Sequence, residues 1–282
     1  MGAKQAELLT ALIQRGGYPW NSAFDRGAIV VPEAGPLPSV ELRDGLVITL
    51  LSPTRSALAS LRPLWAREIA KAGFEPGSPP LDLRYTLDPR DTTEDEEPTV
   101  TEPSHEGSGV TRQGTPVRSV NVEALANAPF TERTSKVNAS SIAFLAEHEG
   151  RSLLIGGDAS VSVLKTSLVR LLRARELRRL PVDLFVVPHM GSRDSVSKEL
   201  LECIACDRYA ISTNGAMFNM PQPEAIARLI IYGRSTPNSA LTIMFNYRSP
   251  SNAVWASQEM QERYRYRAVY PKEGSAGIKV RI

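Results

Sequence analysis

Apolar runs of strand length alternate with helix-period stretches over the second half of the chain. A short apolar run bounded by glycine or proline indicates a buried strand. Apolar residues that recur every three or four positions indicate an amphipathic helix. This pattern predicts strands at 141–147, 152–156, 182–187, 209–213, 241–246 and 277–282, and helices beginning near Ser160 and over 196–205 and 223–231. Strands alternating with helices predict an α/β or layered α+β domain.

The first 74 residues show a weaker version of the same pattern. They predict helices at 4–15 and about 56–72, with a strand at 46–51 between them. Gly16 and Gly17 should end the first helix, and Pro63 suggests a late start for the regular part of the second. We expect residues 1–74 to belong to the same domain as residues 118–282.

Residues 75–117 differ from both flanking parts. They hold 3 Lys and Arg against 10 Asp and Glu, with many prolines and few large apolar residues. Such a stretch cannot bury enough surface to offset its ordering entropy, so we expect a disordered insertion. His105 lies within it, and we do not interpret it as a metal ligand.

The composition is that of an ordinary globular protein, with 282 residues, 42% apolar and 23% charged. No apolar run approaches the roughly 20 residues that cross a bilayer, and the N-terminus does not resemble a signal peptide. We therefore expect a cytoplasmic protein without a membrane partner. Cys203 and Cys206 lack a second pair of zinc ligands, so we interpret them as partly buried thiols.

Asp158 and His189 are the residues that suggest chemistry. Each follows an apolar strand, and each belongs to a residue type that binds metal ions. Taken alone, Asp158 is expected to cap the helix near Ser160, and an isolated histidine is usually structural. Their succession at equivalent strand ends favours a metal site. His148 is expected at the exposed tip of a hairpin.

The order of these motifs resembles the C-terminal half of the metallo-β-lactamase superfamily. The matching residues are Asn138-x-Ser140-Ser141, Gly157-Asp158, Pro188-His189-x-Gly191-Ser192 and Ile211-Ser-Thr-Asn214. They are most similar to the hydrolase domain attached to bacterial DNA-uptake channel proteins. The resemblance covers about residues 136–230.

The resemblance implies a four-layer αββα sandwich, here N-terminally incomplete, with a two-metal site usually holding zinc. Asp158 would be the bridging carboxylate and His189 a ligand of the second ion. The metal pair would activate water against a phosphodiester or similar ester. We further expect Ser192, Arg193 and the amides that start the helix after Ser195 to hold an anionic leaving group.

The chain departs from the family pattern at the remaining ligands. The early His-x-His-x-Asp-His motif is absent, and Met190 and Met220 stand where the family has histidines. Two ligands remain where catalytic zinc uses three per ion, and methionine is a poor zinc ligand in such a site. The sequence therefore predicts a hydrolase-like protein that is inactive alone, or one subunit of a split enzyme whose ligand loop comes from a separate chain.

A non-catalytic module that binds nucleic acid or a nucleotide is the alternative from another class. Residues 118–282 hold 22 Lys and Arg against 15 Asp and Glu, a net charge of +7. Part of this charge lies on the outer face of the helix near Ser160, at Lys165, Arg170, Arg173, Arg175, Arg178 and Arg179. Such a face can bind phosphate, although a solvated helix side is the interpretation we favour.

Overall fold

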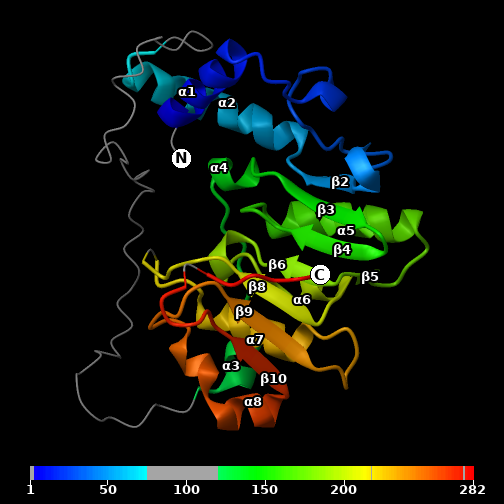
Figure 1. Ribbon diagram of the computed structural model, residues 1–282, viewed down its shortest axis with the longest axis vertical. Helices are drawn as coiled ribbons and strands as arrows, with labels where there is room; N and C mark the ends of the chain where they lie inside the picture. The colour runs from blue at the N-terminus through cyan, green and yellow to red at the C-terminus, as the bar shows by residue number, and fades with distance from the viewer. Residues whose placement is uncertain (1–2, 75–119, 217, 276) are drawn as a thin grey trace. The chain divides into compact units, whose positions relative to one another are not determined.

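The computed structural model describes residues 3–74, 120–216, 218–275 and 277–282 (Figure 1). Its backbone contacts divide the chain into two compact units. The first unit comprises residues 1–28 and 59–118, and the second comprises 29–58 and 119–282. The boundaries expected at residues 74 and 117 stay predictions, and the insertion expected at 75–117, with His105, lies outside the described residues.

The first unit is helical where it is described. Helix α1 spans Ala3–Arg15, a 3₁₀ turn spans Ser22–Phe24, and most of α2 (Arg55–Lys71) belongs here. Both helices confirm the expected positions, although α2 runs through Pro63 without a late start. Leu8 and Ile69 are buried, and the indole nitrogen of Trp65 donates to Glu7 over 2.8 Å.

The second unit is built on one eight-stranded mixed sheet, which confirms the α/β class. The strand order is β1-β2-β3-β4-β6-β8-β9-β10. The strands β1 to β4 pair antiparallel, and β4, β6, β8, β9 and β10 pair parallel. Their bounds are β1 Ser39–Glu41, β2 Val47–Ser52, β3 Ala143–His148, β4 Arg151–Ile155, β6 Leu184–Val186, β8 Arg208–Ile211, β9 Leu241–Phe245 and β10 Tyr266–Val269.

Helices α5 Val161–Ala174, α6 Lys198–Leu201 and α7 Pro223–Tyr232 pack on one face of the sheet, behind the strands in Figure 1. The other helices of this unit are α3 Val122–Ala126, which packs against α7, α4 Lys136–Ala139 and α8 Gln258–Tyr264. A small parallel sheet consists of β5 (Leu180–Pro181) and β7 (Ile204–Ala205). The core joins α5 to the sheet through Leu164, Leu168, Leu171 and Leu172, the face that the periodicity predicts. The four-layer αββα arrangement stays a prediction.

Two expected elements are wrong. Residues 277–282 form no strand, and the strand that closes the sheet is β10, Tyr266–Val269. The predicted helix over 196–205 is only the four residues of α6, because the chain turns into β7 at Ile204. Ser195 does not cap it. The N-cap is Ser197, whose Oγ accepts from the Leu200 nitrogen over 3.1 Å.

His148 also differs from the expectation. It is the last residue of β3 and half-buried, and its Nε2 lies 2.8 Å from the carbonyl oxygen of Asp44. The hairpin turn consists of Glu149 and Gly150, both at positive φ (48° and 74°). Two consecutive residues of this kind form the turn whose twist matches that of a hairpin.

The two cysteines are free and buried. The thiol of Cys203 donates to the Glu199 carbonyl oxygen over 3.4 Å, and the thiol of Cys206 donates to that of Arg208 over 3.1 Å. Burial raises the pKa of Cys206 to about 12. Since a thiol with so high a pKa holds its proton, the pair has the character of core residues.

Among the helices of the described residues, none combines the length and apolar character that crossing a bilayer requires.

Candidate functional site

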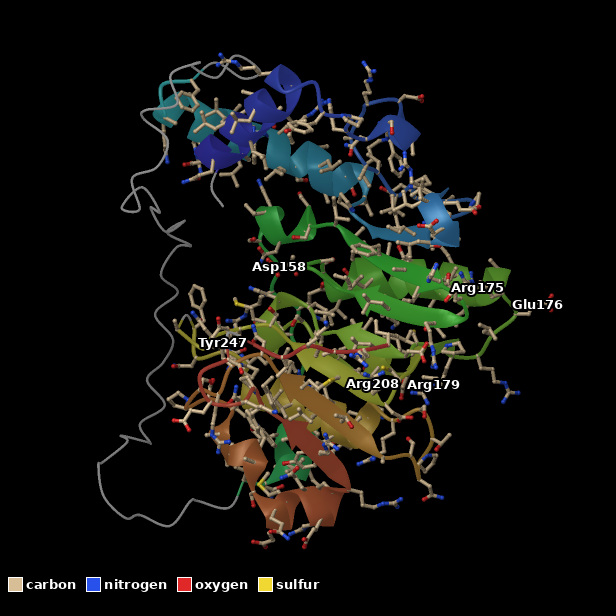
Figure 2. All side chains as sticks on the ribbon, viewed as in Figure 1. Asp158, Arg175, Glu176, Arg179, Arg208 and Tyr247 are labelled. Carbon is tan, nitrogen blue, oxygen red and sulfur yellow. The ribbon has the colours of Figure 1, made fainter. Side chains whose placement is uncertain are left out.

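Asp158 lies just beyond the end of β4, at the edge of the sheet where the parallel strands end (Figure 2). Gly157, directly before Asp158, has φ 55°, and a Cβ there would be 2.6 Å from the Ile142 carbonyl oxygen. Only glycine combines this left-handed backbone with so close an approach to another backbone segment. The carboxylate is half-buried and, within the described residues, makes no hydrogen bond or ion pair.

The N-cap of α5 is Ser160, so the expectation that Asp158 caps this helix is wrong. The Oγ of Ser160 accepts from the Val163 nitrogen over 3.4 Å. A second acceptor also reaches the helix start, because the carboxylate of Glu132 accepts from the Ser162 nitrogen over 3.2 Å. Both contacts satisfy amides that a helix start leaves open. Asp158 therefore does not cap α5, the structural role that would most simply explain an aspartate at this position.

His189 occupies the matching position after β6. The register pairs Ile155 with Val186, and Asp158 and His189 each come three residues later. The two loops touch, since the backbone nitrogen of His189 donates to the Gly157 carbonyl oxygen over 2.8 Å. The structure therefore brings the segments that carry the two expected ligands together at one edge of the sheet.

The His189 ring contacts Asn138, the last-but-one residue of α4. Asn138 Nδ2 lies 3.5 Å from His189 Nε2, and it donates there when that nitrogen carries no proton. This contact engages Nε2 and leaves Nδ1 for another partner. Asn138 itself is positioned by Ser135, whose Oγ accepts from the Asn138 nitrogen over 3.0 Å.

No third metal ligand joins Asp158 and His189 in the described part of the chain. Within it, no group of three or more His, Cys, Asp or Glu side chains is placed to hold a metal ion. Catalytic zinc usually has three protein ligands per ion. These residues therefore do not fit the two-zinc site that the resemblance implies.

Ser192 and Arg193 follow in the next turn, which is fastened to the start of α7. The carboxamide oxygen of Gln222 accepts from the Arg193 nitrogen over 2.8 Å and from the Ser192 Oγ over 3.4 Å. The Gln222 nitrogen in turn donates to the Gly191 carbonyl oxygen over 3.0 Å. Ser192 is buried, so its hydroxyl helps to fix the turn. The anion-binding role expected of both residues stays a prediction.

The charges around this turn are largely balanced. The Arg193 guanidinium lies 3.8 Å from Asp194 and 3.9 Å from Glu224. Desolvation raises the pKa of Asp194, against the opposing effect of Arg193 and two further arginines, Arg133 and Arg228. The turn therefore holds a cationic side chain between two carboxyl groups.

Arg228, which the sequence analysis missed, holds this turn through hydrogen bonds to backbone carbonyl oxygens. Its side chain is buried and donates to the carbonyl oxygens of Arg193, Val196 and Ala128 over 2.6, 2.9 and 3.1 Å. The signal was a charged residue inside the apolar run 225–231 of α7. Gln222 was missed as well, and only its place directly before the helix start marked it.

The basic face of α5 is partly used within the fold. Arg170 donates to the carbonyl oxygens of Pro32 and Gly35, and Arg175 forms a two-pronged pair with Glu147. Arg179, just beyond the helix, donates to four backbone carbonyl oxygens. Half of the six cations therefore hold the chain together, and Lys165, Arg173 and Arg178 are exposed.

No protein-family model, no curated protein and no solved structure matches this chain. The relation to the metallo-β-lactamase superfamily is therefore carried by the motif residues alone and stays a prediction.

Proposed function

We propose that this chain is a metallo-β-lactamase-like protein of phosphodiesterase or nuclease ancestry, and that the isolated chain has no hydrolytic activity. The observation that carries the proposal is the hydrogen bond from the His189 nitrogen to the Gly157 carbonyl oxygen. It joins two loops that follow neighbouring parallel strands and that carry the two metal-binding residue types of the pattern. Sites built on strand ends in this way have their geometry fixed by the sheet.

The proposed lack of activity rests on the ligand count. Asp158 and His189 supply two ligands, and Met190 and Met220 stand at the two later histidine positions of the family pattern. Met220 is buried, which suits an apolar contact. A separate chain that supplies a histidine-rich loop would complete the set, and the protein would then be one subunit of a split hydrolase.

Zinc content and phosphodiesterase activity test this proposal. The purified chain is dialysed against zinc, freed of excess metal and analysed by mass spectrometry, and then assayed on bis(p-nitrophenyl) phosphate. We expect less than about 0.2 zinc per chain, because two ligands hold the ion weakly, and no turnover above the background. Stoichiometric zinc together with turnover, both lost in Asp158→Asn with His189→Ala, would overturn the proposal.

Binding of nucleic acid or a nucleotide without catalysis is the second candidate. The observation in its favour is the net charge of +7 over residues 118–282, with Lys165, Arg173 and Arg178 exposed on or near α5. Binding through phosphates weakens steeply as salt rises. A labelled single-stranded oligonucleotide that binds at 50 mM salt and dissociates at 200 mM salt supports this candidate. Affinity that is absent at low salt, or independent of salt, removes it.

A further inference from the structure

The large sheet has apolar side chains on both faces. One face packs on the helices, through residues such as Phe185 and Ile243. On the opposite face, Leu184 and Met244 are only 4% and 6% exposed, yet neither belongs to the core that joins the sheet to the helices. Something other than that core therefore covers them.

The last residues of the sequence run across this second face. The Arg208 guanidinium donates to the Arg281 carbonyl oxygen over 2.6 Å, and a Cβ on Gly277 would lie 3.8 Å from the Asn246 carbonyl oxygen. Asn246 follows β9 and Arg208 begins β8, so the segment runs along these two neighbouring strands, from their C-terminal ends toward their N-terminal ends. Figure 1 shows its red trace on the side of the sheet away from α5 and α7. Figure 2 shows Tyr247 and Arg208 toward opposite ends of these strands.

The segment follows the sheet as an extended peptide. Residues 277–281 span four steps, and so does the distance along β9 from Thr242 to Asn246. Its burial alternates, because Ile278 and Val280 are half-buried whereas Lys279 and Arg281 are exposed. Side chains of alternating residues point to opposite sides of an extended chain, so one apolar row faces the sheet.

The segment is held more weakly than a strand. Within the described residues it takes part in no strand pairing, and its one side-chain anchor is the guanidinium of Arg208. Just before the segment, an added Cβ on Gly274 would meet no atom within 4 Å, and Ser275 is exposed. Removing the segment would therefore break no backbone ladder.

The charged positions of this face lie at one end of its strands. By register they include Arg151, Arg208 and Arg267, of which Arg151 is paired with Asp183 over 3.2 Å and Arg208 donates to the segment. The middle of the face is apolar, since Phe144, Leu153 and Val186 are half-buried on the same face as the buried Leu184 and Met244. An extended peptide with apolar residues at alternating positions and a backbone carbonyl for Arg208 fits this surface.

We propose that the second sheet face is a docking surface for an extended peptide with alternating apolar residues. Residues 277–282 are its resident occupant, which an incoming peptide of this kind displaces. This inference requires neither a metal ion nor a hydrolytic activity, so it stands apart from the proposed function.

A labelled peptide with the sequence of residues 277–282 tests the docking surface by fluorescence polarisation. A chain that ends at Ser275 should bind it saturably, and the full chain should bind it about tenfold more weakly or worse, because the tethered segment competes at a high effective concentration. Met244→Asp in the shortened chain should abolish binding, whereas Arg173→Asp on α5 should not. Absence of saturable binding to a shortened chain with native circular dichroism would overturn the proposal, as would equal binding to both chains.

Hydrogen exchange on the full chain provides a second test that does not depend on the shortened chain folding. The amides of residues 277–282 should exchange far faster than those of Leu241–Phe245, since a displaceable segment opens without unfolding the sheet. Protection of the segment equal to that of β9 would show a permanent part of the fold and would overturn the proposal.

Discussion

The backbone nitrogen of His189 donates to the carbonyl oxygen of Gly157 over 2.8 Å. This bond lies beyond the last paired residues of β4 and β6, Ile155 and Val186. It continues the contact between the two strands into their loops. The segments that carry the two expected metal ligands, Asp158 and His189, therefore lie at the same end of these strands because the sheet places them there.

Gly157→Ala should destabilise the protein by about 3 kcal/mol, because alanine would bring both left-handed strain and a Cβ 2.6 Å from a backbone oxygen. Gly150→Ala is the matched control, since Gly150 also has positive φ but nothing lies within 4 Å of the added Cβ. It should cost about 1 kcal/mol. Urea denaturation measures both, and equal losses would contradict the close packing around Gly157.

Ser160→Ala should cost about 1 kcal/mol of unfolding free energy, because it removes the N-cap of α5. Asp158→Ala should leave the free energy of unfolding nearly unchanged, since the carboxylate makes no hydrogen bond within the described residues. Thermal or urea denaturation compares the two variants. A larger loss for Asp158→Ala than for Ser160→Ala would show that Asp158 has a structural task.

Arg228→Met should destabilise the protein by about 3 kcal/mol, because three carbonyl oxygens lose their donor in a buried setting. Arg228→Lys should rescue little of this loss, since one ammonium group cannot reproduce the planar fork. Arg173→Met on the exposed face of α5 serves as control. A loss below about 0.5 kcal/mol for Arg228→Met, the range of surface substitutions, would contradict its supporting role.

Asp194 should make stability depend on pH. Desolvation raises its pKa in the folded chain above the unfolded value, so the protonated form is favoured in the folded state. This contribution is fully present below the unfolded pKa and is lost as pH rises through the folded pKa. Asp194→Asn should therefore gain stability relative to the parent chain as pH rises from 3 to about 7. A gain that is constant with pH would contradict the raised pKa.

Much of the sheet and of the site's position was predictable from sequence, because local patterns determine them. The apolar runs at 152–156 and 182–187 and the glycines before Asp158 predict two buried strands and a turn. The edge shared by Asp158 and His189 then follows from parallel pairing. These features need no knowledge of distant contacts.

The features that the sequence did not predict have a different cause, because each depends on contacts with groups far away in the sequence. Residues 277–282 have the alternation of a strand, but β10 takes the place beside β9. Arg228 appears as a misfit in an apolar helix until the three carbonyl oxygens around it are known. Gln222 belongs to the site only because residues 191–193 fold back against it.

The zinc affinity of Met190→His is the most direct test of the central claim, that Asp158 and His189 form an incomplete metal site. The substitution restores a third ligand type beside His189, at a residue whose φ of 55° histidine tolerates. Titration against a chelator should show zinc binding at least about 100-fold tighter than in the parent chain, lost again when Asp158→Asn is added. Unchanged affinity in a natively folded Met190→His chain, or a gain that persists without the Asp158 carboxylate, would contradict the claim.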